Sequence, residues 1–140
     1  MSRRTPIRAK RSGAAALELA ILLPLLIFLF IIGIDYARVF YSTVTITNCA
    51  RNGAIYGSLD PTHSVDTTGI QSAAIADAAN LNPVPDVSST VGVDSAGDTY
   101  VSVTVTGSFQ TVTNFPGVPT TTTITRTVQM RVQPLLPKNS

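Results

Sequence analysis

The chain has 140 residues, of which 44% are hydrophobic and 13% charged, so its length suits one domain. An apolar N-terminal segment takes part of that length, and the small remainder argues against a large catalytic cleft. Five of the ten basic residues lie before Ala14, whereas the chain from Ala14 onward carries five basic and eight acidic residues, a net charge of −3. Because a phosphate-binding surface needs clustered cations, this distribution argues against nucleic-acid binding by that part.

A short basic leader precedes the apolar segment and predicts the topology of the chain. Its five cations are Arg3, Arg4, Arg8, Lys10 and Arg11. Only Arg38 lies close behind the apolar segment, and positive residues collect on the cytoplasmic side of a membrane span. We therefore expect residues 1–13 to be a leader peptide in the cytoplasm and the chain from Tyr36 onward to lie outside.

Residues 14–34 form an apolar run in which Glu18 is the only charged residue. As a helix, this run would be about 31 Å long, which matches the hydrocarbon core of a bilayer. A buried core helix is the alternative, but so small a domain has too little protein to surround a helix that is apolar on all sides. Pro24 lacks an amide hydrogen, so we expect it to kink the span or open its hydrogen-bond ladder, which hints at neighbouring helices.

Small residues stand at the start of the apolar run, at positions 13–16, and not after it. An ordinary secretory signal places them after the run, so conventional signal cleavage is disfavoured. Lipidation of Cys49 is also disfavoured, because this residue lies well beyond the run. Cys49 is the only cysteine, and we expect it on the packing face of a helix, with a link between two chains as the alternative.

The segment Ser12-Gly13-Ala14-Ala15-Ala16-Leu17-Glu18 resembles the processing site of type IV pilin-like proteins. The resemblance implies that a prepilin peptidase cuts after Gly13, which makes Ala14 the first residue of the mature chain. A pair between the freed α-ammonium group and Glu18 of a neighbouring subunit would lower the cost of both charges in a low-dielectric site and set the register of the subunits. In the alternative, Glu18 extends toward the cytoplasmic face of an uncleaved anchor.

Four elements follow one another in the first half of the chain: AALELA at 15–20, LPL at 23–25, DYAR at 35–38 and NCARNGA at 48–54. This series resembles the TadE-like family of Tad pilus systems, in which an acidic-aromatic-small-Arg element closes the span and an Asn, small, Ala, Arg and Gly element follows. The chain departs from the family at Leu19, where members carry Phe or Tyr. It departs again at residues 43–47, a β-branched run of weak helix propensity where the family continues its helix.

A helix that continues from Ala14 to about Tyr56 would be roughly 64 Å long, with residues 35–58 projecting beyond the membrane. Gly57 is the expected stop of this helix. Residues 60–63 are expected to form a loop. A short helix over residues 70–79 follows, with Thr67 or Thr68 as its cap. Its packed stripe would consist of Ile70, Ala73, Ala74 and Ala78.

Beyond Pro85 the hydrophobic period changes to two, which predicts strands at 87–93, 100–109 and about 124–132. A turn at 94–98 and a Pro-containing connection at 114–119 join them, and the threonines at 120–123 lead into the last strand. We expect an α+β fold in which the long transmembrane helix continues outward and packs on a small antiparallel sheet of about three strands. The expected cover of the sheet is Phe40, Val44, Ile46 and Ile55.

Candidate chemical sites outside the helix are weak. Asp60, His63 and Asp66 have a helical spacing that suits metal ligands, but Pro61 favours a solvated loop. Residues 94–98 hold acidic and glycine positions that suggest a calcium turn, yet a hairpin turn explains them without an ion. No Gly-x-Ser-x-Gly nucleophile elbow occurs. We therefore expect no enzyme activity, no metal and no cofactor.

The sequence thus predicts a pilin-like, TadE-type minor pseudopilin that is cleaved after Gly13 and acts in assembly of a Tad or type IV-like pilus. The resemblance implies a prepilin peptidase, other pilin-like subunits and inner-membrane assembly machinery as partners, besides membrane lipid. The expected location is the inner membrane or a surface pilus. Four regions are expected: leader 1–13, span 14–34, helix extension 35–58 and head 59–140. The alternative function is an uncleaved single-pass anchor that displays a small extracytoplasmic binding module.

Overall fold

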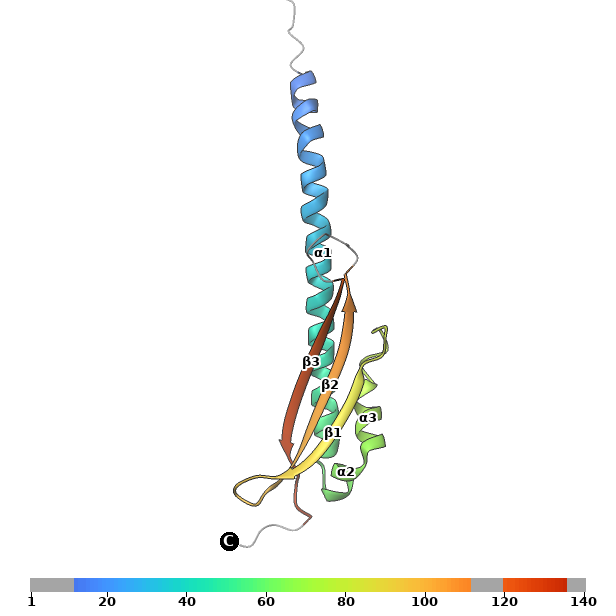
Figure 1. The fold of residues 1–140 in the computed structure, drawn as a ribbon, viewed down its shortest axis with the longest axis vertical. Helices are drawn as coiled ribbons and strands as arrows, with labels where there is room; N and C mark the ends of the chain where they lie inside the picture. Colours follow the sequence, from blue (N-terminus) through green and yellow to red (C-terminus); the bar gives the residue numbers. More distant parts are fainter. Residues whose placement is uncertain (1–11, 112–119, 136–140) are drawn as a thin grey trace, which may run out of the picture.

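A computed structural model describes residues 12–111 and 120–135 (Figure 1). One long helix is followed by two short helices and three strands: α1 (Ser12–Gly57), α2 (Pro61–Val65), α3 (Thr67–Ile75), β1 (Asp86–Val93), β2 (Thr99–Gln110) and β3 (Thr121–Arg131). The α+β fold with a three-stranded sheet is therefore confirmed. The basic leader and the connection expected at 114–119 lie outside the described residues.

α1 is one continuous helix of 46 residues, roughly 69 Å long, that passes through Pro24. Its end at Gly57 agrees with the predicted stop, but the reason is steric. Gly97 alone among the described glycines has a positive φ, so Gly57 is not a left-handed cap. A Cβ atom at position 57 would lie 3.0 Å from Val101 Cγ2, so glycine allows β2 to approach the end of α1.

The β-branched run at 43–47 remains helical because its hydroxyl groups have partners within the helix. Thr43 donates to the Val39 carbonyl at 2.8 Å, Thr45 to the Tyr41 carbonyl at 3.0 Å, and Thr47 to the Thr43 carbonyl at 2.8 Å. These bonds one turn back satisfy polar groups on a partly buried surface. Tertiary packing of this part of α1 then overrides its weak helix propensity.

The sheet has the order β1-β2-β3 and is antiparallel throughout. Inward-facing valines of the central strand, Val101, Val103 and Val105, are fully buried. On the outward face, the hydroxyl groups of Thr104 and Thr127 lie 2.8 Å apart in a cross-strand hydrogen bond. The period-two pattern thus separates an apolar inner face from a hydroxyl-rich outer face, as the sequence predicts.

The outer half of α1 packs on β2, β3 and α3, while the first half extends away from them (Figure 1). The predicted cover of the sheet was only partly right. Ile46 is 2% exposed, but Phe40 is 65% exposed, and Val44 and Ile55 are exposed too. The packing face instead consists of Ile46 and small residues one turn apart, Cys49, Ala50, Gly53 and Ala54. Small side chains occupy this face because they let the backbone of α1 approach its neighbours closely.

The segment after α1 also differs from the expected loop. Pro61 opens the short helix α2, since proline fits the first helical position, and the Asp60 carboxylate accepts from the backbone N–H groups of Thr62 and His63. Asp66 caps α3 by accepting from Gly69 N–H at 2.9 Å, so neither predicted threonine is the cap. α3 ends at Ile75, earlier than predicted, but Ile70, Ala74 and Ala78 are buried as expected.

Candidate functional site

The residues expected at the processing site lie in the first turns of α1. Gly13 and Ala14 are exposed, and a Cβ atom added at Gly13 would meet nothing within 4 Å. No other described part of the chain therefore covers α1 at Gly13 and Ala14.

Glu18 lies one turn beyond Ala14 on the same side of α1, because residues four apart share a helix face. Its side chain is exposed, and no hydrogen bond or ion pair joins it to another described residue. A carboxylate at this depth of an apolar helix is costly unless it reaches the interface or a cationic partner. The three predicted site residues are thus close together on α1, and any partner of Glu18 must come from beyond the described residues.

The first half of α1 presents apolar side chains on every side. α1 is the one helix in the described parts of the chain that is long and apolar enough to cross a membrane, and 0% of its most apolar stretch is buried. The core helix of a water-soluble domain would be largely buried, so this exposure argues against that alternative. Length, composition and exposure together indicate a membrane anchor.

The DYAR element fastens the head to the end of this anchor. Arg38 Nη1 lies 3.6 Å from Asp35 Oδ1, an ion pair between residues that are three apart on the helix. The guanidinium carbon of Arg38 also stands 5.1 Å from the centre of the Phe109 ring, near the end of β2. Sequence reasoning missed the role of Phe109, whose only signal was an aromatic residue at the end of a valine-rich strand. The head therefore contacts α1 directly behind the apolar run.

The NCARNGA element joins α1 to the head core. Cys49, Ala50 and Ala54 are fully buried, and a Cβ atom at Gly53 would lie 3.1 Å from both Ala74 Cβ and Val103 Cγ1. Asn52 Nδ2 donates to Asp77 Oδ2 at 2.7 Å. The small residues of this element are thus required by close packing.

Burial decides the chemistry of Cys49. Desolvation, and then the nearby charge of Asp77, raises the pKa of the Cys49 thiol, which favours its unreactive protonated form. The side chain is 0% exposed, so the alternative of a disulfide between two chains is wrong for this fold. Its expected place on the packing face of the helix is confirmed.

The acidic residues near α2 have structural partners. A hydrogen bond from the Thr62 hydroxyl and one from His63 N–H lower the pKa of Asp60 to about 2. Hydrogen bonds from Gly69 N–H and from the Tyr56 hydroxyl, at 2.9 Å each, likewise lower the pKa of Asp66. These carboxylates hold the ends of two helices. Within the described residues, no group of three or more His, Cys, Asp or Glu side chains is placed to hold a metal ion.

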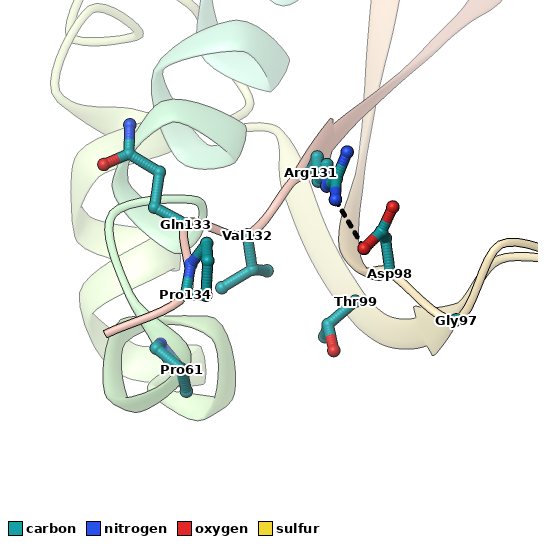
Figure 2. A pocket seen from close by; sticks show the side chains of 8 residues that line it. All are labelled: Pro61, Gly97, Asp98, Thr99, Arg131, Val132, Gln133 and Pro134. Carbon is teal, nitrogen blue, oxygen red and sulfur yellow. Dashed lines mark ion pairs between the residues drawn. The ribbon is translucent and has the colours of Figure 1, made fainter. Parts of the chain in front are cut away.

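A cavity of about 270 Å³ lies at the far end of the head, between the β1–β2 turn and the residues after β3 (Figure 2). Arg131 and Asp98 form an ion pair on its wall. Beside it, Val132 N–H donates to the Thr99 carbonyl at 2.8 Å and Gln133 N–H donates to the Ser58 carbonyl at 2.9 Å. The first two contacts hold the end of β3 against the start of β2, and the third holds it against the residue that follows α1.

Comparison with known proteins adds one match, which falls on this helix. Residues 13–54 match the family model described as TadE-like protein. No curated protein and no solved structure matches the chain. The matched segment contains Gly13, Glu18, the DYAR element and the NCARNGA element, and it ends before the head. This match confirms the TadE-like resemblance seen in the sequence, over residues 13–54 of the N-terminal helix.

Proposed function

We propose that this chain is a pilin-like subunit of the TadE type, a minor pseudopilin that acts in the assembly of a Tad or type IV-like pilus after a prepilin peptidase cuts it behind Gly13. One observation carries the proposal: the TadE-like match begins at Gly13, runs along the exposed apolar half of α1 and continues to the buried residues with which α1 packs on the head. Its role is structural and not catalytic, because α1 presents a surface for insertion among other helices.

The charges at the start of α1 supply a mechanism for assembly. Cleavage after Gly13 would place an α-ammonium group on Ala14. This group would lie at the N-terminal end of the helix, which is the positive end of the helix macrodipole. α1 has no acidic residue in its first turn to offset this charge. Glu18 of a neighbouring subunit can do so, and the pair gains strength because water is scarce there. The pair between Ala14 of one subunit and Glu18 of the next would then fix the axial position of the two subunits relative to each other.

The same proposal fixes the topology. The five cations of residues 1–13 remain in the cytoplasm, residues 14–34 cross the inner membrane, and the helix extension 35–58 with the head 59–140 lies outside. An apolar helix that is exposed on all sides can exchange lipid contacts for contacts with similar helices. Such helices on neighbouring pilin-like subunits and on the assembly machinery are the proposed partners of this surface. Because Pro24 has no backbone N–H, one carbonyl in the preceding turn of α1 lacks its donor within the helix and can accept a hydrogen bond from a neighbouring helix.

Pilus assembly in a host that lacks the chain tests this function. The wild-type chain, Gly13→Ala and Gly33→Ala are returned to the deletion strain, and surface pili are counted by electron microscopy at matched membrane levels of the protein. Gly33 is a matched control because a Cβ atom there also meets nothing within 4 Å. We expect pili with the wild type and Gly33→Ala, and a reduction of at least about tenfold in the number of pili with Gly13→Ala, because the uncut leader would block assembly. Normal pili in the deletion strain would contradict the function, and normal pili with Gly13→Ala would contradict processing.

A further inference from the structure

A second cavity, of about 480 Å³, lies where α1 leaves the proposed span. One face of α1 between Ile34 and Ser42 forms its first wall. Residues 80–82, which follow α3, and Phe109 at the end of β2 form the other side. Neither the proposed function nor the family match gives this cavity a role.

The level of the cavity points to the membrane surface. Ile34 is the last residue of the apolar run, and Ser42 lies eight residues later, about 12 Å further along the helix axis. The headgroup layer on one side of a bilayer is roughly 5–8 Å thick. If residues 14–34 span the membrane, as the proposed function requires, the cavity opens at the level of the lipid headgroups.

The lining of the cavity has two chemical characters. Ile34, Leu81 and Phe109 supply apolar walls, whereas Arg38 and Asn80 supply a cation and an amide. No carboxylate is among the described residues that line it. A phospholipid combines the same two characters, an anionic phosphate and an acyl chain.

Asp35 and Phe109 fix the position of the Arg38 side chain, and these two contacts do not use all five of its N–H donors. Asp35 Oδ1 lies 3.6 Å from one guanidinium nitrogen, and the guanidinium carbon lies over the Phe109 ring. The side chain is nevertheless 46% exposed. Because a guanidinium carries five N–H donors in a rigid fork, the anchored group can still bind a phosphate from outside.

Exposed aromatic residues at the same level support a lipid as the occupant. Tyr36, Phe40 and Tyr41 are each more than half exposed on the turns of α1 beside the cavity. Tyrosine and other aromatic residues collect at the interface between a membrane and water. Val84, close to the cavity-lining residues 80–82 in sequence, is exposed as well. This end of the head thus presents an amphipathic surface that continues the surface of the span.

We propose that this cavity binds one glycerophospholipid of the leaflet on the head side, with its phosphate on Arg38 and Asn80 and an acyl chain along Ile34 and Leu81. A bound lipid would fix the depth of the head relative to the membrane. Removal of the subunit into a filament would then require release of that lipid.

The absence of tryptophan from the chain makes a direct test simple. The Tyr41→Trp variant places a single fluorophore in the cavity wall, and Phe40→Trp places one on the adjacent, non-lining face as a matched control. The full chain in detergent micelles is titrated with dioctanoyl phosphatidylglycerol, inorganic phosphate or glycerol 3-phosphate. We expect a saturable change at one lipid per chain in Tyr41→Trp, a gradual unsaturated change in Phe40→Trp, and no response to either soluble phosphate.

Variants in the Tyr41→Trp background identify the donors. Arg38→Gln should weaken the apparent lipid affinity at least about tenfold, since hydrogen bonds to charged groups are among the stronger ones. Arg38→Lys should retain part of the affinity, and Asn80→Ala should weaken it several-fold. Asn80 is exposed, so this last variant keeps the proposal testable if loss of Arg38 unfolds the head.

Three results would overturn the proposal. The first is a fluorescence response of Tyr41→Trp that does not saturate with lipid. The second is a lipid affinity in Arg38→Gln and in Asn80→Ala equal to that of the Tyr41→Trp background, and the third is a lipid-independent response that grows with protein concentration. The last result would assign the cavity to a neighbouring chain. Extraction of membranes with alkaline carbonate separates this outcome from failure of the proposed function. Release of the chain would overturn both proposals. Retention of the chain together with a failed titration would overturn the lipid site alone.

Discussion

Glu18 combines an exposed carboxylate with an apolar helix, and its cost in lipid makes it the most informative single residue for assembly. Glu18→Gln removes the charge at nearly constant volume. We expect the variant to enter the membrane and to be cut as before. Its association with neighbouring pilin-like subunits should be at least about tenfold weaker, because the α-ammonium group of Ala14 loses its charged partner.

Co-purification of tagged and untagged subunits from mild detergent measures this association. Glu18→Asp is the matched control, since it keeps the charge and shortens the side chain by one methylene group. Equal recovery of partner subunits with Glu18→Gln and the wild type would show that the charge has no part in assembly.

The two capping carboxylates, Asp60 and Asp66, predict how the head responds to acid. Hydrogen bonds to the charged forms lower both pKa values in the fold, that of Asp60 from 3.8 to about 2. A carboxyl whose pKa is lower in the folded state stabilises the fold above its unfolded pKa, and the contribution disappears as the pH falls through the folded pKa. We therefore expect the melting temperature to decrease between about pH 4 and pH 2.

Thermal unfolding of the full chain in detergent, followed by circular dichroism, checks this expectation. Asp60→Asn keeps an acceptor for the cap but cannot titrate, so its melting temperature should change less over the same interval. A wild-type melting temperature that is constant from pH 4 to pH 2 would be inconsistent with the capping role.

At the scale of elements, the packing face of α1 gives a prediction that separates two similar residues. Ile46 is 2% exposed and Phe40 is 65% exposed, although both lie in the outer half of the helix. Ile46→Ala should destabilise the head by about 2–5 kcal/mol because it leaves a cavity in the core. Phe40→Ala should change the stability by no more than about 0.5 kcal/mol. Chemical unfolding in detergent compares them, and equal losses would contradict the observed orientation of α1.

The sequence predicted the strands and the long helix well because their signals are local. Alternation of valine with serine and threonine fixes the inward side of β2, and the apolar run fixes the first half of α1. The packing face of α1 was harder to predict, because hydrophobicity favoured Phe40 over Ala50, whereas the fold needs small residues where two backbones approach. The cap of α3 was missed because threonine and aspartate are both good caps, and only the contact between Asp66 and Gly69 N–H decides.

The proposed processing site rests on a sequence motif, and geometry alone would not single it out. Gly13 and Gly33 have the same structural surroundings, since neither has an atom within 4 Å of an added Cβ. Only the order of basic leader, small residues, Glu18 and apolar run distinguishes Gly13. The cavity beside Arg38, in contrast, could not be predicted from sequence, because it joins residues of α1, of the segment after α3 and of β2.

At the scale of the whole molecule, one continuous helix connects the apolar anchor to the head. α1 carries the apolar surface in its first half and the buried core residues Ile46, Cys49, Ala50 and Ala54 in its second half. The ion pair of Asp35 and Arg38 and the ring of Phe109 join the head to the helix directly behind the apolar run. A change in the depth or rotation of the helix would therefore be passed directly to the head.

The intact mass and N-terminal sequence of the membrane-extracted protein test the central claim most directly. The wild type, Gly13→Ala and Gly33→Ala are each produced with and without a co-expressed prepilin peptidase. We predict a chain that begins at Ala14 for the wild type and Gly33→Ala when the peptidase is present, and an uncut chain for Gly13→Ala. A basic leader that persists in every sample would contradict the pilin-like role and favour an uncleaved single-pass anchor that displays its head outside the cell membrane.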